Sequence, residues 1–155
     1  GCGTGQLSEV MAPFARAVIG VDESAAMLRA ARARLASAGN VELREGALES
    51  LPIEDGALDV AVLSLVLHFV ADPSVALAEV RRTLRPGTGR LVLVDMLPHD
   101  REEYRQSMGH VWLGFAPEQL VGWSSDAGFR TIRHHALPAA PQAKGPTLFA
   151  AVLSV

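Results

Sequence analysis

The strongest constraint on this chain is the regular alternation of short apolar runs with longer segments of helix-forming residues. The runs over 17–22, 41–46, 58–65 and 89–97 predict strands, and the segments over 24–39 and 73–84 predict helices. Strands that alternate with helices pair in parallel, because the chain must cross over before it can run again in the same direction. We therefore expect an α/β fold with a doubly wound, mostly parallel, Rossmann-like sheet.

The last third of the chain departs from this alternation. A helix is predicted from Pro117 to Gly128, and the runs over 129–137 and 147–155 then follow with only a loop over 138–146 between them. Strands joined without a helix pair antiparallel, so we expect an antiparallel final strand pair. Residues 98–116 form a polar, partly helical insertion. We expect residues 1–155 to form a single domain.

A glycine-rich loop opens the chain with the sequence GCGTG, and a helix is predicted to follow from about Gln6. Glycines leave the main chain uncovered for a ligand and allow positive φ angles. Asp22 ends the next predicted strand, where an acid in a doubly wound fold reaches the ribose hydroxyls of a nucleotide. Helix capping is the alternative role for Asp22. The spacing is one residue short of the dinucleotide pattern G-x-G-x-x-G, which leaves S-adenosylmethionine as the other nucleotide to consider.

Taken together, the motifs resemble class I S-adenosylmethionine-dependent methyltransferases, the broad group (methyltransferase type 11) that includes ubiquinone/menaquinone-biosynthesis enzymes. GCGTG, VIGVDESAAML and the stretch over 45–96 carry this resemblance in one collinear series. The later stretch PHDREEYRQSMGHVWLGF is similar to methyltransferases fused to an N-terminal arsenic-repressor-type winged-helix domain, which implies such a fusion here. The resemblance also implies an N-terminally truncated chain that lacks the usual first strand. We expect the isolated polypeptide to bind cofactor poorly.

The resemblance assigns cofactor-binding roles residue by residue. The glycines of the loop and the main chain of Cys2 would pass under the methionine moiety, Asp22 would bind the ribose, and Met27 would form an apolar wall for adenine. Ala47 stands where the family often has an acid, so either the main chain near Leu48 or the neighbouring Glu49 would replace that acid. The implied set is Gly1, Cys2, Gly3, Gly5, Asp22, Glu23, Met27, Ala47, Leu48, Glu49, Ser64 and Leu65.

Three histidines are candidate general bases for the methyl acceptor: His68, His99 and His110. His68 and His99 follow predicted strands at their carboxyl ends, where ligands bind in such sheets, and a histidine titrates near neutral pH. Each could equally be a structural or surface residue. Trp112 and Phe115 could wall an acceptor pocket or pack in the core, whereas His134 and His135 lie in a late strand and are expected to be structural.

Composition narrows the range of partners. The net charge of −3 gives little electrostatic reason for this segment to bind nucleic acid, and the longest apolar run, 58–71, is shorter than the roughly 20 residues that span a membrane. A single cysteine predicts a cytoplasmic protein without a metal site, and argues against arsenite, which seeks several thiolates. We expect S-adenosylmethionine as cofactor and a small-molecule methyl acceptor, with the insertion over 98–116 near the acceptor side. The alternative is a cofactor- or metabolite-sensing module of a transcriptional regulator without turnover.

Overall fold

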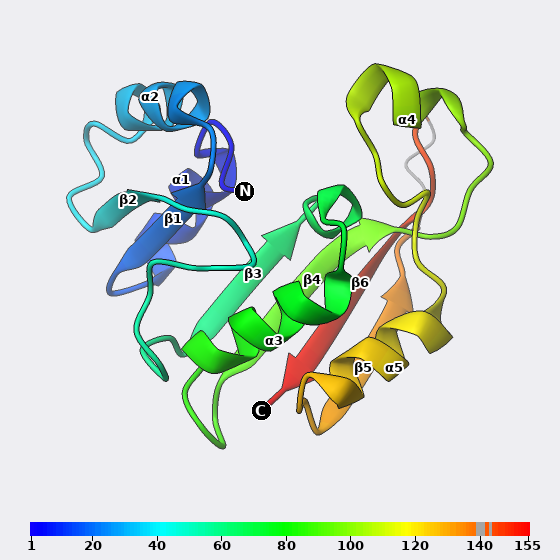
Figure 1. The fold of residues 1–155 in the computed structure, drawn as a ribbon. Coiled ribbons are helices and arrows are strands. Elements are labelled where there is room, and N and C mark those ends of the chain that lie inside the picture. The colour runs from blue at the N-terminus through cyan, green and yellow to red at the C-terminus, as the bar shows by residue number, and fades with distance from the viewer. Residues whose placement is uncertain (139–141, 143) are drawn as a thin grey trace. The chain divides into compact units, whose positions relative to one another are not determined.

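The computed structural model describes residues 1–138, 142 and 144–155, and the chain divides into two compact units, Gly1–Pro52 and Ile53–Val155. Each unit combines helices with a sheet of its own, which confirms the predicted α/β class (Figure 1). The expectation of a single domain stays a prediction, and the two units are described separately below.

The first unit is built around two parallel strands, β1 and β2. Val18 lies opposite Val41 and Asp22 opposite Glu45, so both strands end at the same edge. The core of this unit comes from Val18 and Val21 of the first strand and from the buried face of α2, where Leu28 and Ala31 are fully buried. The elements in chain order are α1 (Gln6–Met11), η1 (Ala12–Phe14), β1 (Val18–Asp22), α2 (Ala25–Arg34) and β2 (Val41–Glu45).

Helix α2 begins as predicted and ends earlier than predicted. The Ser24 side chain caps it by accepting a hydrogen bond from the Met27 amide at 3.4 Å. The helix ends at Arg34 rather than near Gly39. The Asn40 side chain donates to the carbonyls of Ala12 and Ala15, both at 2.9 Å, which fixes the start of β2. The chain therefore leaves the helix early, because it must turn back to reach Asn40.

The second unit contains a four-stranded mixed sheet in the order β3-β4-β6-β5. β3 and β4 are parallel, and β6 pairs antiparallel with both β4 and β5. The predicted antiparallel final pair is confirmed, and β6 lies between β4 and β5. The elements are β3 (Val60–Ser64), η2 (Leu67–Phe69), α3 (Pro73–Thr83), β4 (Arg90–Met96), α4 (Glu103–Met108), α5 (Pro117–Asp126), β5 (Thr131–Ala136) and β6 (Leu148–Ser154).

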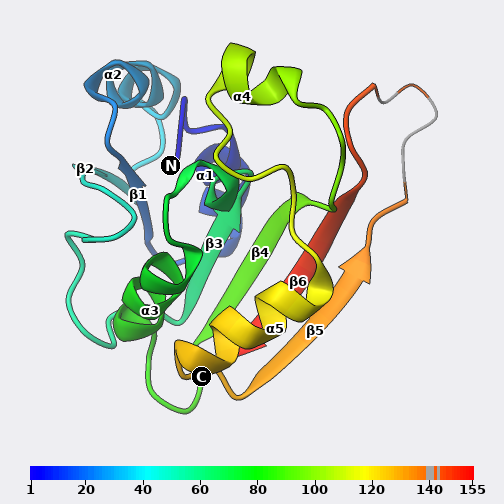
Figure 2. The same ribbon diagram turned by 45° about the vertical axis from the view of Figure 1, so that its right-hand side comes forward.

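Helices α3 and α5 lie on one face of this sheet, and α4 lies beyond the carboxyl end of β4 (Figures 1 and 2). Asp72 caps α3 through the amides of Ser74 and Val75, with Pro73 at the first helical position as predicted. Val60, at the start of the edge strand β3, is half exposed. The fully buried core comprises Leu77, Leu84, Leu91, Leu93, Phe115, Leu120, Phe149 and Leu153.

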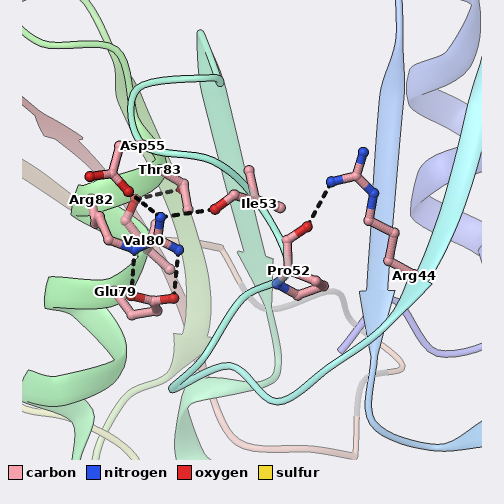
Figure 3. Close-up of polar contacts among 8 residues, drawn as sticks. All are labelled: Arg44, Pro52, Ile53, Asp55, Glu79, Val80, Arg82 and Thr83. Carbon is pink, nitrogen blue, oxygen red and sulfur yellow. Dashed lines mark hydrogen bonds and ion pairs between the residues drawn. The ribbon is translucent and has the colours of Figure 1, made fainter.

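A charged network fixes the start of the second unit to α3. Arg82 contacts both oxygens of Glu79 at 2.7 and 2.8 Å, pairs with Asp55, and donates to the Ile53 carbonyl at 2.9 Å (Figure 3). These acceptors raise the pKa of the Arg82 guanidinium above its ordinary value. In the first unit, Arg44 makes a comparable contact with the Pro52 carbonyl at 2.6 Å (Figure 3).

Two expectations about loops remain open. Of the predicted loop over 138–146, residues 139–141 and 143 lie outside the described residues. The predicted insertion over 98–116 contains α4, and its placement near a methyl acceptor stays a prediction. In the ranges that the structure describes, every helix is too short or too polar to cross a bilayer.

Candidate functional site

The glycine loop of the first unit is closed onto the end of β1 by Asp22. The Gly3 amide donates to one carboxylate oxygen, Oδ2, at 2.7 Å, and the Ser24 amide donates to the other, Oδ1, at 2.9 Å. The Cys2 amide donates to the Val21 carbonyl at 2.7 Å, so the main chain of the loop is also hydrogen-bonded to the end of β1. Asp22 is only 7% exposed. The acid therefore organises the loop, and it does so through backbone donors.

Two glycines of the loop have positive φ angles for different reasons. Gly5 has a φ of 81°, and a Cβ there would lie 2.8 Å from Cδ1 of Leu35, so α1 and α2 approach too closely for a side chain. Gly3 has a φ of 55°, and no atom lies within 4 Å of the place where its Cβ would stand. The space above Gly3 is therefore open, and a ligand can approach the main chain there.

The Asp22 carboxylate keeps unused capacity for a nucleoside. Each carboxylate oxygen can accept about two hydrogen bonds, and each one accepts a single backbone donor within the described residues. Two neighbouring ribose hydroxyls are donors that match this free capacity. Burial and the nearby Asp22 raise the pKa of the Cys2 thiol, so Cys2 stays protonated and contributes main chain rather than a nucleophile. The loop and Asp22 thus fit the predicted cofactor.

The other predicted cofactor residues of the first unit differ in exposure. Glu23 and Glu49 are exposed, and Met27 is 43% exposed in the first turn of α2, where its apolar side chain is available to a ligand. Ala47 forms an isolated bridge with Ser50, while the Leu48 side chain is buried. Burial leaves only the main chain of Leu48 to contact a ligand. Their roles toward adenosine remain predictions.

In the second unit, the carboxyl end of β3 carries a strained residue. Leu65 has a φ of 56°, the only positive value at a non-glycine residue of the described chain, although its amide is held by the Val94 carbonyl at 2.8 Å. A leucine in this region costs about 1–3 kcal/mol, and such strain gathers at functional sites. Leu65 is 42% exposed, and its neighbour Ser64 is partly exposed. Both are predicted cofactor residues.

His68 lies in η2, immediately after that strand end, and forms a buried pair with Asp95 of β4. Nδ1 of His68 lies 2.8 Å from Oδ1 of Asp95, and the two side chains are 3% and 0% exposed. The Met96 amide donates to the same oxygen at 2.9 Å. The second oxygen, Oδ2, is buried and has no hydrogen-bond partner in the described chain. This is an acid–base pair away from bulk water.

The structure brings the three candidate histidines into one cluster around Tyr104. The ring centres of His68 and His110 are 4.2 Å apart, and the Tyr104 ring lies 5.2 Å from His110 and 5.4 Å from His99. Burial lowers the pKa of both His99 and His110. The Arg101 guanidinium lowers the pKa of His99 further, and the neighbouring His68 ring has the same effect on the pKa of His110. Both rings are therefore neutral at physiological pH.

The remaining aromatic and histidine candidates pack as structural residues. Phe115 is fully buried, and Trp112 donates from its indole nitrogen to the Val70 carbonyl at 3.0 Å. Both contact Trp123 of α5 edge to face. His134 stacks on Phe149 at 4.7 Å between ring centres. The described residues contain no group of three or more side chains that could hold a metal ion.

Sequence reasoning missed Asp95, although a signal for it was present. VIGVD ends β1, and LVLVD stands one residue before the end of β4, so each acid comes directly after a run of apolar strand residues. The pattern that singled out Asp22 could have singled out Asp95. The partner of Asp95 lies 27 residues away and was not predictable from that pattern.

Comparison with known proteins identifies the family. The model of the methyltransferase domain family matches residues 1–93. A ubiquinone/menaquinone biosynthesis C-methyltransferase of Syntrophotalea carbinolica is 32% identical over 87% of this chain and 68% of its own length. The chain belongs to the S-adenosylmethionine-dependent methyltransferases. Its cofactor is S-adenosylmethionine, which the geometry of Gly3 and Asp22 accommodates.

Two further matches show how much of each related protein this methyltransferase chain covers. An uncharacterised 37.1 kDa protein of a Streptomyces fradiae transposon is 40% identical over 83% of the chain, which spans only 41% of that protein. The crystal structure of a Thermotoga maritima SAM-dependent methyltransferase superposes with a TM-score of 0.74 and 27% identity, covering 99% of this chain and 78% of that one. The Rossmann-like methyltransferase fold is thereby confirmed.

Proposed function

We propose that the protein transfers a methyl group from S-adenosylmethionine to a small-molecule acceptor by in-line displacement. The observation that supports this most directly is the loop in which Asp22 holds the Gly3 amide beneath an open space. When bound, S-adenosylmethionine supplies a methyl group on a positively charged sulfur, which is already activated for displacement. The protein then has mainly to bind, orient and desolvate the two reactants.

The residues present suit that limited task. Asp22 would accept the ribose hydroxyls, and Gly3 would let the ligand approach the main chain without a side-chain clash. Holding a nucleophile in line with the methyl carbon can lower the barrier by about 7–11 kcal/mol in favourable cases. An elaborate catalytic array is therefore unnecessary. The alternative of a sensing module without turnover receives no support, since the named relatives are methyltransferases.

The names of relatives suggest which acceptors to test first. Two methyltransferases, of Clavibacter sepedonicus and Staphylococcus aureus, are named for demethylmenaquinone, and the Thermotoga maritima protein is described as a possible histamine N-methyltransferase. A reduced naphthoquinone and histamine are thus suitable small-molecule probes. The ring contacts among His68, His110 and Tyr104 place aromatic and hydrogen-bonding groups together in the second unit, and we propose this cluster as the acceptor side.

Calorimetry on the full-length gene product tests the cofactor assignment. S-adenosylmethionine and its demethylated product, S-adenosylhomocysteine, should both bind at micromolar concentrations. Absence of binding for both would refute the proposed function. Turnover is then measured as S-adenosylhomocysteine formed in the presence of 1,4-naphthalenediol, kept reduced under nitrogen, or of histamine, with a reaction lacking acceptor as the blank.

A further inference from the structure

We propose that His68 is the general base that removes a proton from the methyl acceptor, and that Asp95 is the positioning residue that fixes the His68 ring. This inference rests on the proposed methyl transfer and narrows its substrate class. The acceptor must carry a proton that is lost on methylation, as a hydroxyl or an amine does. A thioether or a tertiary amine has no such proton and would not need His68.

The contact with Asp95 determines which nitrogen of His68 is available. A carboxylate only accepts hydrogen bonds, so the 2.8 Å contact requires that Nδ1 of His68 carries the proton. In the neutral ring, Nε2 then holds the free lone pair. Asp95 is itself held in place by the Met96 amide, which donates to the same oxygen at 2.9 Å. The pair therefore fixes both the tautomer and the orientation of the ring.

The second ring nitrogen of His68 is the one left without a partner. His68 is 3% exposed, and Nε2 makes no hydrogen bond within the described part of the chain. The amides of Val111 and Trp112 donate to the His68 carbonyl at 3.0 and 3.1 Å, which fixes its main chain. The ring is thus fixed at Nδ1 and at its main chain, and Nε2 is the nitrogen that we assign to the acceptor.

The position of the pair matches where ligands bind in such sheets. His68 follows β3 and Asp95 lies near the end of β4, and these two strands are parallel. Their carboxyl ends share one edge of the sheet, the edge at which ligands of doubly wound folds bind. The strained residue Leu65 stands three residues before His68 at the same strand end. Two independent features therefore mark this edge.

The surroundings favour His68 over the other two histidines. The ionisable groups near it are Asp95 on β4, His110 on the segment after α4, His99 after β4 and Tyr104 on α4. His99 and His110 have lowered pKa values and have no carboxylate bonded to their rings. Of the three histidines, only His68 has a ring nitrogen bonded to a carboxylate within the described chain, and Oδ2 of that carboxylate is buried without a partner. His68 is therefore the histidine that a neighbouring acid orients.

The chemical step balances without any further reactant. The O–H or N–H bond of the acceptor breaks, and its proton passes to Nε2 of His68. An electron pair of the acceptor forms the new bond to the methyl carbon. The bond between that carbon and sulfur breaks, and its electron pair stays on sulfur, which becomes neutral. The imidazolium of His68 later returns the proton to water.

The test compares Asp95→Asn, His68→Gln and the double variant with wild type in the full-length protein. Asp95→Asn keeps the shape of the side chain and removes its charge. His135→Gln is the matched control, because His135 is an exposed histidine on β5. The probes are reduced 1,4-naphthalenediol and histamine. We measure kcat, the pH dependence of kcat/KM, and the dissociation constant of S-adenosylmethionine by calorimetry.

We expect His68→Gln to lower kcat by about 10²–10⁴-fold, the usual contribution of a general base. Asp95→Asn should lower kcat by at least about tenfold, and the double variant should be no slower than His68→Gln, because the two residues act as one unit. The acid limb of the kcat/KM profile should disappear in His68→Gln. His135→Gln and the cofactor affinity of all variants should match wild type.

Nitrogen-15 spectra of the histidines test the tautomer without any acceptor or variant. Nδ1 of His68 should show the protonated signal and Nε2 the bare one in the neutral ring, and Asp95→Asn should weaken that preference. The reverse tautomer, or unchanged kcat in both variants, would overturn the proposal. So would the lack of turnover with either probe by a protein that binds cofactor. Loss of cofactor binding in wild type would instead refute the proposed function itself.

Discussion

Replacing Asp22 with alanine should weaken S-adenosylmethionine binding more than a single ribose contact would suggest. The carboxylate accepts two backbone hydrogen bonds, from Gly3 at 2.7 Å and from Ser24 at 2.9 Å. A hydrogen bond to a charged group contributes about 1.5–3 kcal/mol. Gly3 and Ser24 are partly exposed. Water therefore replaces part of each lost hydrogen bond, and the lower end of this energy range applies. Alanine therefore removes the proposed ribose contact and also releases the loop that presents the main chain.

If the ribose contact contributes about 1.5 kcal/mol and the release of the loop costs about as much again, the combined loss is about 3 kcal/mol, which corresponds to roughly 100-fold weaker binding. The affinity of Asp22→Asn for the cofactor should lie between those of wild type and Asp22→Ala. The single oxygen of the asparagine can still accept a hydrogen bond from one of the two amides, while its NH₂ group faces the other. Calorimetric titration of the full-length protein with S-adenosylhomocysteine measures both variants. Asp126→Asn, an exposed acid at the end of α5, is the control. Dissociation constants within threefold of wild type for both Asp22 variants would refute this reasoning.

Three other changes test single features. Leu65→Gly should raise the free energy of unfolding, measured by urea titration, by about 0.5–1 kcal/mol. The reason is that the strain energy released at φ 56° exceeds the entropic cost of the more flexible glycine in the unfolded chain. A destabilised variant would show that Leu65 is not strained. Arg82→Ala should lower the free energy of unfolding more than Arg85→Ala does, because Arg82 joins Glu79, Asp55 and the Ile53 carbonyl, whereas Arg85 makes one exposed pair with Asp59. Equal losses would show that the network around Arg82 adds nothing. The pKa values of His99 and His110 are lowered in the folded state, so the unfolded chain binds protons at a higher pH than the folded chain does. The free energy of unfolding is therefore highest above about pH 6.5 and falls as the pH is lowered. The decrease is at most about 1.4 kcal/mol per pH unit for each histidine. Urea titrations at pH 7.5 and 5.5 should show a smaller loss for His110→Gln than for wild type, and an equal loss would show that His110 does not contribute.

The local sequence was sufficient to predict most elements and the glycine loop with Asp22. Strand and helix starts depend on neighbouring residues, such as Ser24 before α2 or Asp72 and Pro73 at α3, and these were found correctly. The end of α2 was wrong because it depends on Asn40, whose partners Ala12 and Ala15 lie more than twenty residues earlier. The loop and Asp22 were recognisable because both belong to one motif joined by a single strand.

Only the tertiary structure distinguished among the candidate histidines of the second unit. Three histidines could be named as candidates, but nothing near them in the sequence distinguishes His68 from His99 or His110. The pairing of β3 with β4 brings the ends of both strands to one edge, and this places Asp95 against His68. Both acids that end apolar strands, Asp22 and Asp95, look alike in the sequence. They differ because one strand end meets backbone amides and the other meets an imidazole, and contacts between distant segments are set by packing rather than by local residue order.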